Sequence, residues 1–222
     1  MNYSNYILFD LETTGLNKND DAQIVQIAAL CADCRTLKIK QGSQFQTLVK
    51  PLYGEEAAQA NLEELSDAAI KVHGKTHEML ESAPDAHSVI KNFVNFVNQY
   101  NWKGTDFSKP IAVTYNGIGF DLPIIERYFK KFGFENPFHR IYKVDMMDHM
   151  FTTFENDKNV NRLSLDNLVR GYMGYKDPDG MKGHDAMADV LLLHSLFERY
   201  MKLIRKLNKN TKFAGAMSDR KV

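Results

Sequence analysis

The 222-residue chain is 44% hydrophobic, which allows one core of generous size and leaves too little length to favour two full domains. Its 28 basic and 28 acidic residues cancel, so nucleic-acid binding would have to come from local basic surface or bound cations, not from a global positive field. No apolar run approaches the roughly 20 residues of a membrane span, and the first residues have no basic leader region, so we expect no membrane contact and a cytoplasmic location.

The two cysteines, Cys31 and Cys34, are too few for a disulfide scaffold. A zinc site would need two further ligands, and a redox pair normally opens a helix after a strand. We therefore expect ordinary buried or strand-end thiols.

The first half of the chain predicts three strands followed by helices. Residues 3–10 form an apolar stretch that ends at a carboxylate, which is typical of a buried strand delivering a residue to the edge of a sheet. Residues 24–32 and 37–50 predict two further strands, which together with the first form an antiparallel meander. From 55 to 100 the apolar spacing is helical, and His73-Gly-Lys-Thr76 predicts a helix end followed by an N-cap.

The second half alternates strands with helices. Two short strands are predicted at 110–115 and 140–144. The predicted helices are 120–132, 145–154, 163–172 and 185–207, with a loop at 174–183. The order predicts an α/β fold in one domain, residues 1–207, followed by a basic, flexible tail, residues 208–222.

Asp10 and Glu12 are the first candidate functional residues. Alternate residues of an extended chain share a face, so these two carboxylates point the same way. Mg²⁺ and Mn²⁺ prefer oxygen ligands, and two ions about 4 Å apart can bind both the attacking and the leaving oxygen of a phosphodiester. Carboxylate pairs are also common on protein surfaces, so this pair needs partners before it indicates metal chemistry.

Two further acids supply candidate partners. Asp121 follows the carboxyl end of a predicted parallel strand, where open α/β sheets carry ligands; the alternative is an acid that serves a helix dipole. Asp189 lies one turn into an otherwise apolar helix, where a buried and uncompensated carboxylate would cost several kcal/mol. A bound cation would compensate it. Asp185 is better explained as a first-turn or capping residue.

These residues belong to a series of motifs that resembles a known family. The motifs are FDLETTG from Phe9, IVQIAAL from Ile24, VHGKT from Val72, NGIGFD from Asn116, LSLDNL from Leu163 and HDAMAD from His184. Their order, spacing and strand or helix context resemble those of the DnaQ-like, DEDDh-type 3′→5′ exonucleases, over essentially the whole chain to about Tyr200.

The resemblance implies a ribonuclease H-like fold, a mixed five-stranded sheet flanked by helices whose first three strands form the antiparallel meander. It also implies hydrolysis of terminal phosphodiesters with two divalent cations, Mg²⁺ or Mn²⁺, which releases nucleoside 5′-monophosphates. By this analogy Asp10, Glu12, Asp121 and Asp189 are metal ligands and catalytic residues.

The resemblance implies that His184 is the general base. An imidazole titrates near neutral pH and can accept a proton from water beside a carboxylate–metal cluster. The sister subtype would place a tyrosine where this chain has Asp185, so the histidine subtype is the better match. The remaining histidines of the chain other than His73 are expected to be structural: His77, His87, His139, His149 and His194.

The same resemblance implies contacts to the terminal nucleotide, with Leu16 as a wedge against a base. The expected substrate-binding residues are Leu11, Thr13, Thr14, Leu16, His73, Asn116 and Phe120. The alternatives remain open: turn chemistry for residues 13–15, core packing for Phe120 and helix capping for Asn116. The chain departs from the family pattern at Gln26, where members often have Glu, and at Tyr115, where they often have His; neither change removes a metal ligand.

Three functions are carried forward. The first is an exonuclease on 3′ ends of single-stranded DNA, in proofreading, repair or processing, acting alone or beside a separate polymerase or replication protein. The second keeps the chemistry and acts on RNA, as a 3′-end trimming or oligoribonuclease-like enzyme, because recognition of a 2′-hydroxyl depends on pocket geometry. The third is a non-catalytic nucleic-acid-binding module of a replication complex. The basic stretch from Lys202 onward either tracks a phosphate backbone or, as we prefer, is a solvated helix face.

Overall fold

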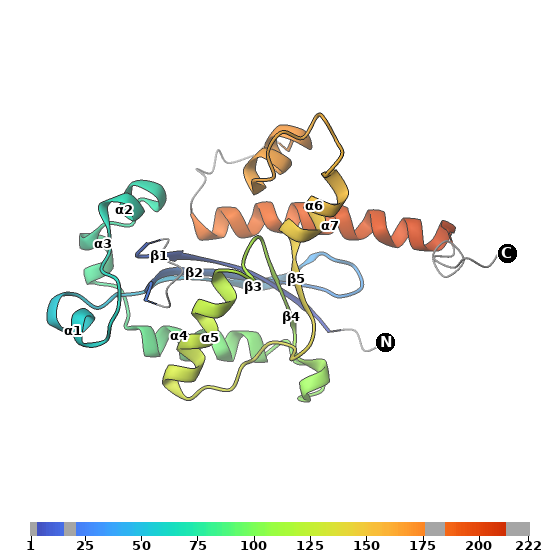
Figure 1. The fold of residues 1–222 in the computed structure, drawn as a ribbon. Coiled ribbons are helices and arrows are strands. Elements are labelled where there is room, and N and C mark those ends of the chain that lie inside the picture. Colours follow the sequence, from blue (N-terminus) through green and yellow to red (C-terminus); the bar gives the residue numbers. More distant parts are fainter. Residues whose placement is uncertain (1–3, 16–20, 176–184, 212–222) are drawn as a thin grey trace.

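The computed structural model of the protein describes residues 4–15, 21–175 and 185–211 (Figure 1). His184 and Leu16, both predicted to be functional, lie outside these residues. Within the described ranges, no helix combines the length and the apolar composition that crossing a bilayer requires.

A five-stranded mixed sheet forms the centre of the molecule. The strands are β1 (Tyr6–Thr13), β2 (Ile24–Ala32), β3 (Ile39–Leu48), β4 (Ile111–Thr114) and β5 (Lys143–Asp145). Their order across the sheet is β3-β2-β1-β4-β5. β1, β2 and β3 pair antiparallel, whereas β4 pairs parallel with β1 and with β5. The predicted fold, with its antiparallel meander and mixed sheet, is confirmed.

Helices cover both faces of this sheet, with α6 and α7 on one side and α4 and α5 on the other (Figure 1). The helical segments are α1 (Gly54–Gln59), α2 (Asp67–His73), α3 (His77–Glu81), α4 (Ala86–Asn98), η1 (Asp106–Ser108), α5 (Asp121–Phe132), α6 (Met146–Phe154), η2 (Asn167–Tyr172) and α7 (Ala186–Thr211). β1 alternates between the two cores. Phe9 packs with the α4 and α5 side, whereas Leu8 packs with the α7 side. Because alternate strand residues share a face, Asp10 and Glu12 follow Leu8 toward α7.

Several predicted boundaries are wrong for identifiable reasons. β1 continues past Asp10 to Thr13, because Asp10 and Glu12 still pair with β2, opposite Ala28 and Gln26. β5 begins at Lys143 and not at residue 140. The reason is that the ring of His139 accepts the backbone N–H groups of Ile141 and Tyr142, the two residues that precede β5, and holds them in a turn.

Helix boundaries differ as well. The predicted helix 163–172 is largely a π-helix, η2, with a backbone bond from Met173 N to Leu168 O at 2.9 Å. α7 continues past the predicted end at Leu207 to Thr211. The predicted turn after α2 is confirmed, since Gly74 ends α2 in the left-handed region and Thr76 caps α3.

The basic residues near the C-terminus of α7 lie far along the helix from Asp189, which is in its first turn (Figure 1). The guanidinium of Arg205 donates to the carbonyl oxygens of Arg35 and Cys34 at 2.7 and 2.8 Å, and Lys202 pairs with Glu198. These residues therefore serve the turn between β2 and β3 and the helix surface. Both cysteines are free thiols at the end of β2 and in this turn, as predicted.

Asp145 organises the loop that leads from β4 to α5. Its carboxylate accepts the backbone N–H groups of Asn116 at 2.8 Å, Ile118 at 3.0 Å and Met147 at 3.0 Å. Asn116 has a φ of 61°, a backbone conformation that residues other than glycine rarely adopt. A Cβ at Gly117 would lie 2.5 Å from Thr114 Cβ, which is too close, so this position requires glycine. The tight loop depends on these contacts, and it places the start of α5 against β1.

We expect Asp145→Ala to lower the free energy of unfolding by about 3 kcal/mol, because it leaves three partly buried N–H groups without their acceptor. Chemical denaturation followed by circular dichroism measures the change. Asp148→Ala, at an exposed position in the same helix turn, is the matched control and is expected to change stability by less than about 0.5 kcal/mol. Equal effects of the two substitutions would contradict the role assigned to Asp145.

Candidate active site

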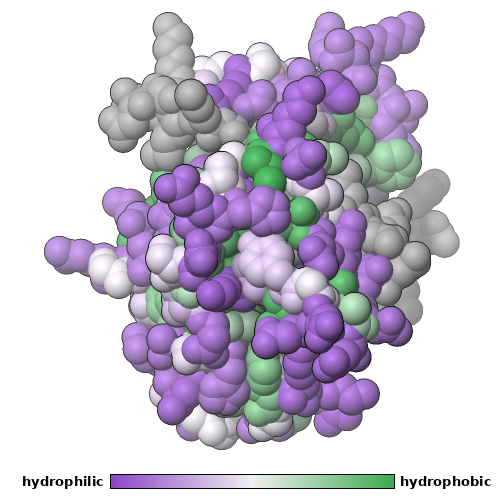
Figure 2. Space-filling model, turned by 90° about the vertical axis from the view of Figure 1, so that its left-hand side faces the viewer, coloured by the Kyte–Doolittle hydropathy of each residue, from purple (hydrophilic) through white to green (hydrophobic). Residues whose placement is uncertain are grey.

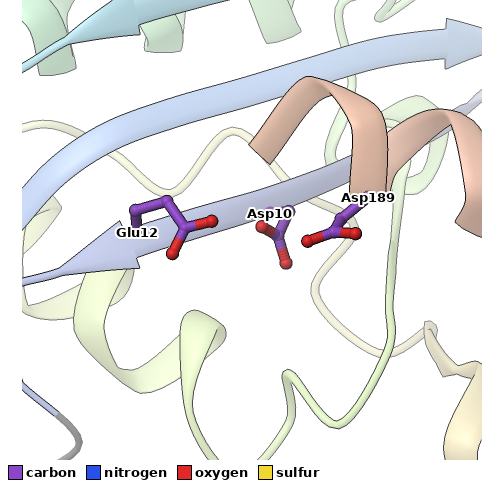
Figure 3. Close-up of side chains that lie close together, drawn as sticks. All are labelled: Asp10, Glu12 and Asp189. Carbon is purple, nitrogen blue, oxygen red and sulfur yellow. The ribbon is translucent and has the colours of Figure 1, made fainter. Parts of the chain in front are cut away.

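Three carboxylates meet where α7 crosses the sheet. Asp10 and Glu12 extend from β1 and Asp189 from the first turn of α7, and Figure 3 shows Asp10 and Asp189 pointing toward one another. One oxygen from each of the three side chains lies within 4.8 Å of the others. Strand alternation and the first turn of one helix are thus sufficient to bring these acids together.

Asp121 is the fourth acid of the site. It is 6% exposed at the start of α5, and its carboxylate accepts the N–H of Leu11 at 3.1 Å, so it contacts the backbone of β1 directly. Its charge contributes to the raised pKa of Asp10. The structure therefore brings all four predicted ligands to one place, although Asp121 does not belong to the close trio formed by the other three.

The electrostatics of this cluster disfavour ionised carboxylates in the absence of a cation. Burial, followed by the charges of Asp121, Asp189 and Glu12, raises the pKa of Asp10 well above its usual range. Burial and the charge of Asp189 raise the pKa of Glu12 to about 8, although the Lys75 ammonium opposes this shift. Burial raises the pKa of Asp121 to about 7, against the lowering effect of the hydrogen bond from Leu11. The site therefore has a deficit of positive charge.

The donor set fits a hard divalent cation. All four side chains offer carboxylate oxygens, the ligands that Mg²⁺, Mn²⁺ and Ca²⁺ take, and none offers sulfur or imidazole nitrogen. A cation held here would favour the ionised forms and remove the repulsion among them.

A pocket of about 950 Å³ opens over these acids. It is lined by Val72 and His73 of α2, by Asn116 and Phe120, and by the segment around Arg162. The face of the molecule shown in Figure 2 is largely hydrophilic and is broken by a smaller patch of apolar side chains. The lining of the pocket itself combines apolar side chains, among them Leu11, Val72 and Phe120, with the acids of the cluster.

Most of the predicted substrate-binding residues line this pocket: Leu11, Thr13, His73, Asn116 and Phe120. Thr14 does not. It is fully buried, and its hydroxyl accepts the N–H of Gln23 at 2.9 Å while its carbonyl accepts from Ser66, so turn chemistry is the better explanation for this residue. The capping role considered for Asn116 is wrong, because the residue before α5 is Phe120 and no side chain caps that helix.

Sequence reasoning missed three residues beside the acids. Lys75 forms an ion pair with Asp185 at 2.9 Å, and Gln46 donates to the same carboxylate at 3.2 Å. Arg162 lines the pocket. The lysine inside the VHGKT motif was the one available signal for these residues, because a lysine that becomes buried next to a helix end needs an ion-pair partner. Asp185 itself caps α7, as predicted, by accepting the N–H of Met187 at 3.2 Å.

The raised pKa values predict how pH and divalent cations act on stability. Because the pKa of Glu12 is about 8 in the folded protein and about 4.5 in a solvated glutamate, the folded protein holds more protons than the unfolded chain between these values. The stability of the cation-free protein is therefore expected to fall as pH rises from about 4.5 to about 8. A fixed Mn²⁺ concentration, about 100 times the dissociation constant at pH 8, should raise the melting temperature by about 5–10 °C at pH 8. The rise should be much smaller at pH 5, where protonated acids bind Mn²⁺ more weakly.

Differential scanning calorimetry of the wild type, Glu12→Gln and Glu78→Gln measures this effect. Glu12→Gln should raise the melting temperature of the cation-free protein at pH 8 and reduce the Mn²⁺-induced rise. Glu78→Gln, at an exposed position in α3, is expected to behave like the wild type. Identical Mn²⁺ responses in Glu12→Gln and the wild type would place the binding site elsewhere.

The comparisons with known proteins agree with this geometry. Residues 7–197 match the RNase T family model, which describes an exonuclease. The chain is 29% identical over 133 residues to the PolC-type DNA polymerase III of Oceanobacillus iheyensis, a match that spans 59% of this chain and only 7% of that polymerase.

Two solved structures show the same fold at low sequence identity. E. coli exonuclease I in complex with a dT13 oligonucleotide has a TM-score of 0.69 and 18% identity, over 97% of this chain and 46% of that one. The nuclease domain of 3′hExo, a DEDDh family member bound to rAMP, has a TM-score of 0.67 and 16% identity, over 90% and 92% of the two chains. Taken with the match to the family model, the acidic cluster and the mixed sheet identify this chain as a nuclease of the RNase T exonuclease family, with the ribonuclease H-like fold.

Proposed function

We propose that this chain is a 3′→5′ exonuclease that hydrolyses the terminal phosphodiester of single-stranded DNA and releases nucleoside 5′-monophosphates. The observation that carries the proposal is the convergence of Asp10, Glu12 and Asp189, with Asp121 beside them, on the floor of one pocket. A site of this composition can compensate the charge of a phosphodiester only with cations, which suits metal-assisted hydrolysis.

In this mechanism Asp10, Glu12, Asp121 and Asp189 hold two divalent cations, Mg²⁺ or Mn²⁺. When bound, these ions supply positive charge against the phosphodiester oxygens and lower the pKa of water. His184 takes the proton of the attacking water as the general base. The bond between phosphorus and the 3′ oxygen of the preceding nucleotide breaks, that oxygen takes up a proton, and the new phosphate stays on the 5′ side of the released nucleotide. His184 directly precedes the α7 cap, Asp185, in the sequence, which supports its assignment.

We propose DNA as the substrate in preference to RNA, because two of the similar proteins are named with DNA. The matched polymerase is a DNA polymerase, and exonuclease I was solved with a DNA oligonucleotide. The likeness to the polymerase segment also supports work beside a separate polymerase or replication protein. RNA is the second candidate, since 3′hExo was solved with rAMP. A non-catalytic binding role is disfavoured, because an idle module would be expected to lose ligands and this chain has all four acids and the histidine.

Arg162 is proposed to bind a phosphate of the substrate strand. Among the described residues that line the pocket, it is the one lysine or arginine, whereas the rest of the lining includes several acids. A polyanion entering such a pocket needs a cationic contact, and a guanidinium can bind a phosphate with two parallel hydrogen bonds. Its side chain is exposed and therefore accessible to substrate.

End-labelled oligonucleotides test polarity and chemistry together. With Mg²⁺ or Mn²⁺, a 3′ label should be released at once as a mononucleotide, whereas a 5′-labelled strand should shorten step by step; EDTA should stop both.

His184→Ala is expected to lower kcat by about 10²- to 10⁴-fold while the Mn²⁺-induced rise in melting temperature persists. His87→Ala, at an exposed position in α4, is the matched control with unchanged turnover. Early release of the 5′ label, or full activity of His184→Ala, would refute the assignment. Parallel DNA and RNA digests decide the sugar preference.

The phosphate contact is tested by steady-state kinetics on a single-stranded oligonucleotide. Arg162→Ala is expected to raise KM by about 10-fold with a smaller change in kcat, since one charged hydrogen-bonded contact contributes about 1.5–3 kcal/mol. The rise in KM should shrink as salt increases. Lys158→Ala removes an exposed cation from the same segment outside the pocket and should leave KM unchanged. Equal effects of the two substitutions would reduce the role of Arg162 to general charge.

A further inference from the structure

Lys75 is a cation beside the acidic cluster, where its charge acts on Glu12, and it does not line the pocket. It follows the glycine that ends α2, and its side chain is only 11% exposed. Its ammonium nitrogen donates to Asp185 Oδ2 at 2.9 Å. Because a buried lysine costs free energy unless it is paired, the position of Lys75 is tied to that of Asp185.

The carboxylate of Asp185 accepts hydrogen bonds from side chains in three parts of the fold. Besides Lys75 from the turn between α2 and α3, Gln26 of β2 donates to Oδ2 and Gln46 of β3 donates to Oδ1, each at 3.2 Å. Oδ1 also accepts the N–H of Met187, so the same carboxylate caps α7. The first turn of α7 is therefore fixed against the sheet and against α2 by one side chain.

Two further contacts carry this anchoring to the catalytic acids. The carbonyl of Asp185 accepts the N–H of Asp189 at 3.0 Å, and Gln26 Oε1 accepts the N–H of Ala186 at 3.2 Å. Gln26 lies opposite Glu12 in the β1–β2 register. The anchored turn thus carries one ligand of the cluster, adjoins a second across the strand pair, and is preceded directly in sequence by His184.

We propose that Lys75 is a positioning residue for the nuclease reaction, acting through Asp185 to hold the first turn of α7, and with it Asp189, in register with β1. This inference rests on the proposed function of the same site. A lysine that only stabilised the fold would change stability and leave the metal dependence and turnover of folded enzyme intact. A positioning residue changes both.

The experiment is a double-mutant cycle with Lys75→Met, Asp185→Asn and the double variant, each assayed on a labelled single-stranded oligonucleotide. Lys75→Met is expected to lower kcat at least 10-fold and to raise the Mn²⁺ concentration for half-maximal activity, with KM for the oligonucleotide changed less than 2-fold. The double variant should be no worse than Asp185→Asn alone, because the two residues act as one unit. Lys75→Arg, which keeps the charge, should restore most of the activity. Lys71→Met, at an exposed position in α2, is the matched control with wild-type kinetics.

A readout independent of turnover accompanies the cycle. Amide hydrogen exchange in the cation-free protein should be faster at residues 186–189 in Lys75→Met than in the wild type, and unchanged in the core strands. If Lys75→Met does not fold, Asp185→Asn breaks the same contact and carries the comparison, with Lys75→Arg as the variant expected to keep most of the activity.

Three results would overturn the proposal. Additive losses in the cycle would show that Lys75 acts independently of Asp185. A loss confined to KM would make it a substrate contact. A lower melting temperature with unchanged kcat and Mn²⁺ dependence would leave it a structural residue. Failure of the proposed function is distinguishable, since the wild type would then leave the labelled strand intact while the coupling remains measurable by hydrogen exchange and by Mn²⁺-induced thermal stabilisation.

Discussion

Asp10, Glu12 and Asp189 hold carboxylate oxygens within 4.8 Å of one another in a partly buried pocket. The electrostatic repulsion among these carboxylates when they are ionised is the constraint on which the rest of the structure depends. The pKa of each of the two β1 acids is raised by burial and by the neighbouring acids, so the folded chain without cations favours protonated forms. A fold can tolerate such a cluster only if other contacts keep the strands and helices from moving apart, and a bound cation would stabilise it further.

Two capping aspartates provide these contacts in parallel ways. Asp145 caps α6 and also accepts N–H groups from the loop that leads to Asp121. Asp185 caps α7 and also accepts side chains from β2, β3 and the turn after α2, next to Asp189. In each case a carboxylate outside the cluster fixes the segment that carries a carboxylate inside it. Asp121 and Asp189 are thus held in place by two other carboxylates, each of which accepts several hydrogen bonds.

Local pattern predicted the strands, the antiparallel meander and four candidate acids, because strand alternation and helix periodicity determine which face a residue occupies. The family resemblance implied that the four acids form one site. It could not predict that β1 continues to Thr13, since that depends on pairing with β2. Nor could it predict the π-helical turn after Ser164 or the Lys75–Asp185 contact, which joins residues 110 positions apart in the chain. Thr14 was assigned to substrate through a family resemblance, but its burial against Gln23 depends on the packing of a turn.

Anomalous diffraction from crystals grown with Mn²⁺ tests the central claim, that the carboxylate cluster is a divalent-cation site, most directly. We expect Mn²⁺ peaks bounded by Asp10, Glu12 and Asp189, with Asp121 able to complete the coordination, at metal–oxygen distances of about 2.0–2.3 Å. The peaks should disappear in crystals of Asp10→Asn. An ordered cluster without manganese at saturating Mn²⁺, or peaks only at other surface acids, would contradict it.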